Sequence, residues 1–470
     1  MENRGFSAMH RVLILSVLIL VVSCSESEPG GNDPGDPQPN PNEVSVVIPT
    51  GNENYLNLKS DYIYDQSKLH TFELNLPAGN LEKLDNDPTA EKYVEGSLTF
   101  EGETLSPIGI RYKGSIGAYV GCVSGSDWSN PSGRKTCTKL SMKVKVNWND
   151  SDDKFYGLKK LQFHSQNLDD SQMRDRLGYH LFREMDVPAP RSVHAKLLVN
   201  GVFVGVFAMV EQIDGRFTRQ NFDNGKGNLY KEIWPLHSSG SPFRSADYLA
   251  SLETNEDEDP TSEMIESFAR AIQSASEDSL KAVVRRWMNI DEIIAYAVVD
   301  RTIRADDGPF HWYCDGGISS SDCSPHNFYW YEEPTERTMH LIPWDLDNAF
   351  ENIILDNNPV TPIADSWGET SSNCEPFSYG RFNLMQKSAA CDKLIYAWTL
   401  FEDEYSAIKE DFKNGPFAEE EVSPLLDLWA AQIREATQEA ASIHEDAVSI
   451  VKWETALNNM KASLSIARTK

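Results

Sequence analysis

The sequence predicts an α+β fold, with a strand-rich first part followed by a helical second part. In residues 45–235, polar and apolar residues alternate between turn residues, which is the period of a half-buried strand. In residues 236–470, apolar residues recur at every third or fourth position, as they do on one face of a helix. Strands and helices that are separated in this way along the chain are typical of α+β proteins. The chain has 470 residues, enough for both parts and an appendage.

The N-terminus resembles the signal peptide of a bacterial lipoprotein. Basic residues precede the apolar run Val12–Val22, which is too short for a comfortable membrane span. The run leads into Val-Val-Ser-Cys, similar to a lipobox, in which Cys24 is lipidated and becomes the first mature residue. An ordinary signal peptide with an incidental cysteine is the alternative. The serine after Cys24 favours the outer membrane, by resemblance to Gram-negative lipoproteins. We therefore expect removal of residues 1–23 and a lipid anchor at the outer membrane or cell surface.

Residues 24–44 are expected to form a disordered tether, because they are mostly Ser, Glu, Gly, Asp, Pro and Asn without apolar periodicity. We expect membrane contact through the lipid anchor only. The formal net charge of −29 argues against nucleic acid as a partner, since phosphate binding requires clustered Lys and Arg. A phosphate-bearing ligand would need metal ions or a local basic strip.

The cysteines indicate disulfides. Seven cysteines minus Cys24 leave six, an even number, as is usual in an oxidising compartment. Fifteen pairings are possible, and pairing between neighbours is the simplest. A zinc site is the alternative, but its paired CxxC spacing is missing. The neighbouring pairs are Cys122 with Cys137, Cys314 with Cys323, and Cys374 with Cys391.

The strands follow from alternation and turn signals. We expect them at residues 45–48, 69–76, 93–100, 108–113, 139–148, 155–163, 193–198, 202–210 and 229–231. Asn200-Gly201 between two of these runs is a hairpin signal. In residues 139–148, Met142 and Val144 share one face, and Lys139 and Lys143 share the other. The lysine face is either a solvated outer face or a basic strip for phosphate groups.

Helices dominate the later part of the chain, after one earlier helix. That helix is expected to begin at Asp169-Asp170-Ser171, with an acidic first turn, and to end before Pro188. Apolar periodicity predicts further helices at residues 262–274, 277–288, 290–300, 394–412, 419–443 and 447–464.

Acidic residues and one amide form the candidate chemical site. Asp345 and Asp347 follow an apolar strand, Asp307 lies in a loop after a buried helix, and Asn327 opens the next strand. Mg²⁺ prefers such oxygen ligands, and phosphoryl transfer uses one carboxylate to orient a hydroxyl while others hold metal. The alternatives are acids that cap a turn or are solvated. Asp306 competes with Asp307 for the role of base.

Several motifs together resemble the CotH (spore coat protein H-like) kinase family. They are IGIRYKGSIG, KLSMKVKV, FYGLKKLQFHSQNLDDSQMRDRLGYHLFREMDVPAPRSVHAKLLVNGVFVGVFAMVEQID, GNLYK, HNFYWYEE and IPWDLDNAF, within residues 108–350. The resemblance implies a two-lobed atypical protein-kinase-like fold, with a β-rich lobe (45–235) and a helical lobe (236–470). It also implies binding of ATP with Mg²⁺ or Mn²⁺ and phosphorylation of protein hydroxyls outside the cytoplasm.

The resemblance assigns roles by position. Asp307 matches the catalytic acid, Asp345 and Asn327 match metal-binding positions, and Asp347 assists. The implied nucleotide-binding positions are Lys139, Lys143, Arg174 and Glu211. Salt bridges are the alternative for Arg174 and Glu211. The chain departs from the family at Ser115, where asparagine is usual, and in a longer insertion between residues 313 and 327.

Two other functions stay open at this point. One is a catalytically silent surface lipoprotein that binds polysaccharide or a protein partner, because the N-terminal tether and the many aromatic residues are compatible with such a protein. The other is a sugar transferase that uses the Asp345-x-Asp347 acids with a nucleotide-sugar. ATP is scarce outside the cytoplasm, so the sequence leaves the phosphoryl donor open.

Overall fold

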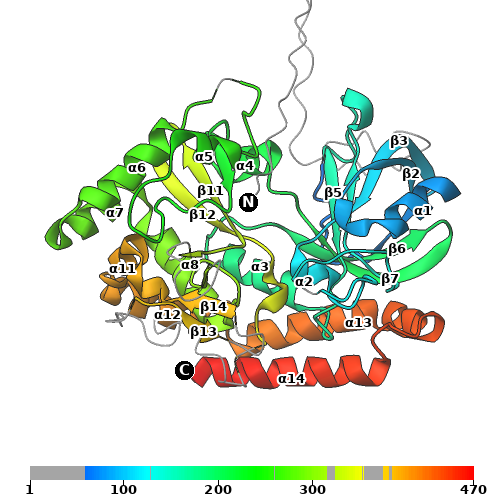
Figure 1. The fold of residues 1–470 in the computed structure, drawn as a ribbon. Coiled ribbons are helices and arrows are strands. Elements are labelled where there is room, and N and C mark those ends of the chain that lie inside the picture. The colour runs from blue at the N-terminus through cyan, green and yellow to red at the C-terminus, as the bar shows by residue number, and fades with distance from the viewer. Residues whose placement is uncertain are drawn as a thin grey trace, which may run out of the picture. The chain divides into compact units, whose positions relative to one another are not determined.

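The structure is a computed structural model that describes residues 59–469, except 128, 259, 315–322, 352, 354–373 and 380–383. The described residues belong to one compact unit, residues 49–470. Cys24, the tether and the predicted strand 45–48 lie outside the described residues. The predicted α+β class is confirmed, with the elements arranged as in Figure 1.

Seven strands close into a barrel in the order β1-β2-β3-β4-β5-β7-β6. These strands are β1 (His70–Asn75), β2 (Val94–Phe100), β3 (Glu103–Tyr112), β4 (Met142–Lys145), β5 (Lys160–His164), β6 (Ser192–Val199) and β7 (Val202–Val210). Neighbours pair antiparallel except β1 and β6, which run parallel. An apolar cluster that includes Phe72, Val144 and Phe163 fills the barrel. β4 is shorter than predicted but alternates as expected, with Met142 and Val144 buried and Lys143 on the outer face.

The predicted hairpin at Asn200-Gly201 joins β6 to β7. Asn200 has φ of 50° and Gly201 has φ of 77°, as a two-residue turn with positive φ at both positions requires. Asn200 also caps the neighbouring strand, because its side chain accepts a hydrogen bond from the Leu76 amide at 2.7 Å. The turn therefore fixes the register of two strands at once.

A second sheet has the order β12-β11-β8, and a third has the order β10-β9-β14-β13. Their strands are β8 (Leu229–Lys231), β9 (Trp312–Cys314), β10 (Cys323–Ser324), β11 (Phe328–Glu333), β12 (Thr338–Pro343), β13 (Phe377–Tyr379) and β14 (Leu384–Lys387). β8 precedes residue 235 but pairs with β11 beyond it. The predicted domain boundary at that residue stays a prediction.

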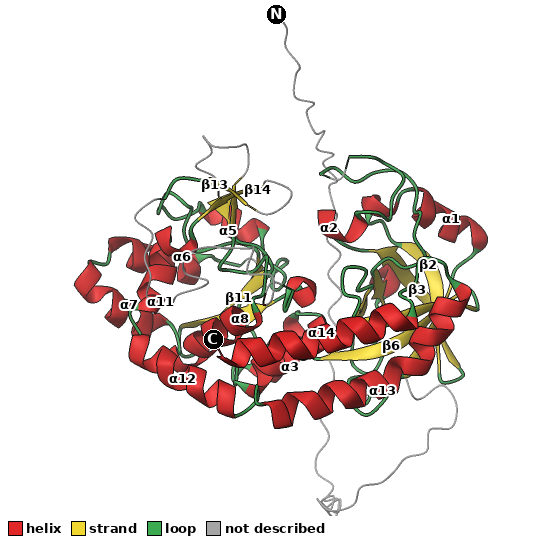
Figure 2. Ribbon diagram, turned by 90° about the horizontal axis from the view of Figure 1, so that it is seen from below, coloured by secondary structure: helices red, strands yellow, loops and turns green. Residues whose placement is uncertain are grey.

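Helices cover the second sheet and one side of the barrel. They are α1 (Ala78–Asn86), α2 (Ile116–Tyr119), α3 (Arg174–Glu184), α4 (Gly215–Asn221), α5 (Ser245–Ala250), α6 (Glu263–Ser274), α7 (Leu280–Trp287), α8 (Ile290–Ile303), α11 (Lys393–Thr399), α12 (Glu402–Asn414), α13 (Glu419–Ile443) and α14 (Ile450–Thr469), with short 3₁₀ helices η2 (Pro88–Ala90), η3 (Trp148–Asp150), η4 (Glu277–Ser279), η5 (Leu346–Asn348) and η6 (Ala389–Cys391). α13 and α14 lie side by side, and α13 contacts β7 (Figures 1 and 2). Among the described residues, none of the helices has both the length and the apolar character to cross a membrane.

The prediction of one continuous helix at residues 394–412 is wrong, because the structure has two helices there. Phe401 separates α11 from α12, with a ψ of 51° that is not helical. Its ring is fully buried, and the cationic groups of Lys281 and Arg285 lie 4.7 and 4.9 Å from the ring centroid. Burial of this aromatic ring stabilises the break, which apolar periodicity alone does not reveal.

The three predicted neighbouring cysteine pairs form disulfides: Cys122–Cys137, Cys314–Cys323 and Cys374–Cys391. Cys314 and Cys323 also face each other in the pairing of β9 with β10. All six cysteines are thus used in disulfides, which leaves none of them as a thiolate ligand for zinc.

Candidate active site

The second sheet brings three chain segments to one edge. Because β8 and β12 both run antiparallel to β11, the start of β11 lies beside the ends of the other two strands. Glu232 follows β8, Asn327 precedes β11, and Asp345 lies two residues after β12. The loop after α8 adds Asp307, whose carbonyl and carboxylate both accept hydrogen bonds from Asn327. Folding therefore gathers residues that are far apart in the sequence.

Asp307 and Asn327 form a direct pair. The Asn327 Nδ2 donates to Asp307 Oδ2 at 2.9 Å and to the Asp307 carbonyl at 3.1 Å. Burial raises the pKa of Asp307 to about 8, and the charges of Asp306 and Asp345 add to this effect. Asp306 differs, because its Oδ1 lies 2.9 Å from Nδ1 of His311. This geometry favours Asp307 over Asp306 as the acid that faces the site.

The backbone at the site adopts an unusual conformation. Asp307, Asn327 and Asp345 have φ values of 74°, 56° and 54°. Non-glycine residues seldom adopt positive φ, although Asp and Asn tolerate it best, and such residues gather at functional sites. Surrounding contacts must therefore hold these three residues in place.

Helix α3 holds the Asp345–Asp347 loop. The Asp345 amide donates to the Tyr179 hydroxyl at 2.9 Å, and Arg174 donates to the Asp347 carbonyl at 2.8 Å. Gly178 permits this close approach, because a Cβ there would lie 2.7 Å from Cδ1 of Leu346. Burial raises the pKa of Asp347 well above its ordinary value, and Asp345 adds to this effect. Crowded, buried carboxylates of this kind favour a bound cation.

His164, Asp175 and Asp345 have ligand atoms within 4.8 Å of one another. His164 Nδ1 lies 3.2 Å from Asp175 Oδ2. The other oxygen, Asp175 Oδ1, is buried without a hydrogen-bond partner among the described residues. An orphaned carboxylate oxygen in a group of two acids and an imidazole fits a divalent cation such as Mn²⁺ or Mg²⁺.

Cationic side chains from the outer face of the barrel approach the acids. Lys113, directly after β3, places Nζ 2.8 Å from His164 Nε2 and 5.1 Å from the centroid of the Trp344 ring. Burial lowers the pKa of Lys113 to about 8, whereas the charge of Asp345 acts in the opposite direction. The Asp175 carboxylate therefore orients the imidazole of His164, which in turn holds the lysine amine.

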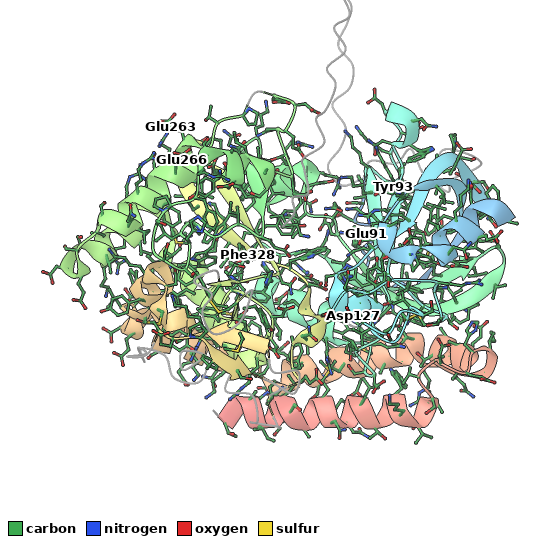
Figure 3. The ribbon with its side chains drawn as sticks, viewed as in Figure 1. Glu91, Tyr93, Asp127, Glu263, Glu266 and Phe328 are labelled. Atoms are coloured by element: carbon green, nitrogen blue, oxygen red, sulfur yellow. A yellow bond between two sulfur atoms is a disulfide. The ribbon has the colours of Figure 1, made fainter. Side chains whose placement is uncertain are left out.

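Further cationic side chains lie on the barrel strands next to Lys113. Arg111 pairs across the strands with Lys143, and Glu91 accepts a hydrogen bond from Arg111. Burial lowers the pKa of Lys143 to about 7, and its neighbours Lys160 and Lys113 lower it further. Figure 3 labels Glu91 on the barrel side and Phe328 at the start of β11. The barrel thus supplies cations to a site whose acids come from the helices and the second sheet.

The other predicted nucleotide-binding residues lie elsewhere or have structural partners. Lys139 donates to the Val206 carbonyl at 2.6 Å, in a separate cavity. Glu211 is buried in an ion-pair group with Arg191 and Arg216, at 2.6 and 3.4 Å. Arg174 contacts the acidic loop through Asp347, and Lys143 lies close enough to Lys113 for the charge of Lys113 to lower its pKa. Of the four predicted residues, Arg174 and Lys143 therefore lie beside the candidate site.

Sequence reasoning missed Lys113, His164 and Asp175. Asp175 is adjacent to Arg174, and Lys113 belongs to the motif IGIRYKGSIG, so both could have been found there. His164 gave no such signal, because an isolated histidine in an apolar strand is usually a packing residue. The position of His164 in the site follows only from the structure, in which β3, β4 and β5 are neighbours in the barrel.

Comparison with known proteins identifies the family. A family model described as CotH kinase protein matches residues 110–465, which include every residue of the site described above except Glu91. A search of curated proteins found no match. Because the family model covers well over half of the chain, the protein belongs to the CotH kinase family.

Proposed function

We propose that this protein is a lipid-anchored, extracytoplasmic kinase that transfers phosphate from ATP to protein hydroxyl groups with the help of a divalent cation. Membership of the CotH kinase family supports a kinase-like function. The observation that carries the proposal is the gathering of Asp307, Asn327 and Asp345 opposite Lys113. Phosphoryl transfer depends mainly on such positioning and on neutralised charge.

Each side chain has a role in this proposal. A cation held by Asp175, Asp345 and the Nδ1 of His164, in place of the hydrogen bond between His164 and Asp175, would neutralise charge on the phosphates of ATP. Lys113, beside His164, donates hydrogen bonds to a phosphate oxygen. Asp307 accepts the proton of the substrate hydroxyl while the new O–P bond forms and the bond between the γ-phosphorus and the β-phosphate oxygen breaks. Asn327 keeps the Asp307 carboxylate in position for this transfer.

The test measures nucleotide binding by calorimetry and transfer of labelled phosphate from ATP, with residues 44–470 in Mg²⁺ or Mn²⁺. Asp345→Asn removes a ligand charge but tolerates the positive φ at this position. We expect phosphate transfer to fall by about 100-fold or more. Glu263→Gln, an exposed change at the start of α6, serves as the control.

Two outcomes would contradict the proposal. If wild-type protein neither binds ATP with metal nor transfers phosphate, the silent binding protein becomes the better function. If the protein instead cleaves a nucleotide-sugar or transfers the sugar from it, the sugar transferase becomes the better function.

A further inference from the structure

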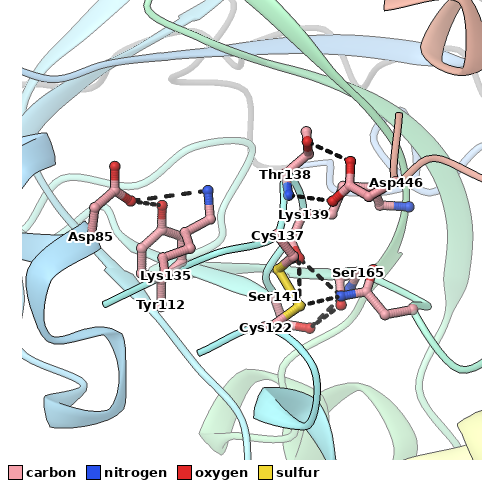
Figure 4. The surroundings of a disulfide bond; sticks show 11 residues. Asp85, Tyr112, Cys122, Lys135, Cys137, Thr138, Lys139, Ser141, Ser165 and Asp446 are labelled. Carbon is pink, nitrogen blue, oxygen red and sulfur yellow. Dashed lines mark hydrogen bonds and ion pairs between the residues drawn. A yellow bond between two sulfur atoms is a disulfide. The ribbon is translucent and has the colours of Figure 1, made fainter. Parts of the chain in front are cut away.

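A second polar cavity lies apart from the acids described above, between the barrel and the C-terminal helices. Its volume is about 310 Å³. The walls come from the loop closed by Cys122–Cys137, the segment between β5 and α3, the strand β7, and the helices α13 and α14 with their connection. Figure 4 shows the part of this region around Cys137, Lys139 and Asp446. Most of the cavity lining consists of side chains that the proposed kinase activity does not use.

The cavity is built around the amine of Lys139. Its Nζ donates to the Val206 carbonyl at 2.6 Å and lies 5.0 Å from the centroid of the Phe207 ring. Gly205, with φ of 135°, makes room for the lysine stem, because a Cβ there would lie 3.0 Å from Cδ of Lys139. Asn167 holds the backbone by donating to the Lys139 carbonyl at 2.9 Å. The position of the amine is therefore fixed before any ligand arrives.

This amine has no ion-pair partner among the described residues. The acids that line the cavity already have other partners. Asp446 accepts from the Thr138 amide at 2.6 Å and from its hydroxyl at 2.7 Å (Figure 4). Asp170 pairs with Lys452 at 2.9 Å. The third acid, Asp169, accepts from the Ser171 and Arg174 amides, both at 2.9 Å.

Hydrogen-bonding capacity also stays unused. An ammonium group has three N–H donors, and the contact with Val206 uses one of them. On the same lining, Gln166 is 7% exposed and donates to the Gln172 carbonyl at 2.9 Å. Its Oε1 is buried without a hydrogen-bond partner among the described residues. The cavity thus combines an unpaired cationic donor with an unused neutral acceptor.

We propose that this cavity binds a small hydroxycarboxylate of sugar-acid size, with its carboxylate on Lys139 and a hydroxyl on Gln166. A neutral sugar would leave the ammonium without a counter-charge. A dianionic phosphate would meet three aspartates and only two lysines in the lining. One negative charge on a hydroxylated body satisfies both groups. The acid can be free or the end unit of an acidic polysaccharide. This inference does not depend on kinase activity.

The experiment compares ligands that differ in one group. Galacturonate and galactose share the same ring and differ at C6, where the first carries a carboxylate. Calorimetry or saturation-transfer NMR with residues 44–470 should show galacturonate binding at least 10-fold more tightly than galactose or inorganic phosphate. Lys139→Met should weaken galacturonate binding at least 10-fold, whereas the control Lys154→Met, at an exposed side chain that does not line the cavity, should change it less than 3-fold. Stronger binding of trigalacturonate would identify a polymer as the source, and stronger binding of the monomer the free acid.

A second measurement avoids dependence on the folding of the variant. In wild-type protein, acetylation of Lys139 by an N-hydroxysuccinimide ester can be followed by peptide mass spectrometry, with the exposed Lys154, outside the cavity, as the internal reference. Galacturonate should slow acetylation of Lys139 at least 5-fold and leave acetylation of Lys154 unchanged. Equal binding of galactose, tighter binding of phosphate, no protection of Lys139, or no binding of any sugar acid would overturn the proposal.

Discussion

At the scale of single residues, the site depends on side chains that position one another. Asp175 contacts His164, His164 contacts Lys113, and Lys113 lies near Asp345. Asp307, Asp345 and Asp347 were predictable, because each follows a strongly patterned element, whereas Asp175 was missed. The lysine was missed as well, since the alternation of residues 139–148 pointed to Lys139 and Lys143. A strand pattern shows which face a lysine occupies but not which neighbouring element that face meets.

Replacing Lys113 tests this assignment. Lys113→Met keeps the length of the buried stem and removes the amine, so the affinity for ATP should fall on the order of 10-fold and phosphate transfer by about 100-fold. Calorimetry and initial rates at several ATP concentrations measure the two effects. Lys145→Met, further along the same barrel face, is the matched control. If Lys139→Met weakens ATP binding and Lys113→Met does not, the nucleotide lysine is the one that the family resemblance implied.

At the scale of elements, helix α3 fixes the Asp345–Asp347 loop through close packing. Periodicity predicted the helix, although it begins at Arg174 and not at Asp169-Asp170-Ser171 as expected. It gave no reason for Gly178 in the helix interior, where glycine costs about 1 kcal/mol relative to alanine. The structure supplies the reason, because the Cβ of any other residue at this position would meet the side chain of Leu346. Long-range contacts of this kind determine a residue without leaving a local pattern in the sequence.

A double-mutant cycle tests the contact between α3 and the loop. Gly178→Ala should destabilise the protein by about 1 to 3 kcal/mol, because the added methyl group meets Cδ1 of Leu346 and overpacking outweighs the gain in helix propensity. In a Leu346→Ala background the same change should cost less, since the obstructing atom is gone. Urea unfolding of the four proteins gives the coupling energy. Additive effects would show that the two residues do not compete for the same space.

At the scale of the whole molecule, a buried arginine joins segments that the sequence separates widely. Arg176 on α3 is 1% exposed and donates to the Gln66 carbonyl, to Gln432 Oε1 on α13 and to His194 on β6, each at 2.8 Å. Its guanidinium also lies 4.4 Å from the centroid of the Trp429 ring. The strands and helices were largely predictable one by one. Barrel closure was not, because the parallel pairing of β1 with β6 joins residues more than 100 positions apart.

This junction makes the stability of the protein sensitive to acid. His194 is fully buried; its Nδ1 accepts from Arg176, and its Nε2 donates to the Gln172 carbonyl at 2.6 Å. Burial lowers the pKa of His194 to about 3, and the charge of Arg176 lowers it further. A histidine in the unfolded chain has a pKa of about 6.5. Below this pH, the unfolded chain therefore binds a proton that the folded chain does not bind. The contribution of His194 is therefore present above about pH 6.5 and is lost as the pH falls towards 3.

The expected loss is about 1 kcal/mol between pH 6.5 and 5.5, and roughly 1.4 kcal/mol for each further pH unit down to the folded-state pKa. Urea unfolding at several pH values measures it. His194→Gln is the matched variant, because its amide can still accept from Arg176 and donate to Gln172 without titrating. The free energy of unfolding of this variant should therefore depend less steeply on pH than that of the wild type. Identical slopes would mean that His194 is protonated, or exposed, in the folded protein, and that Arg176 joins the barrel, α3 and α13 without it.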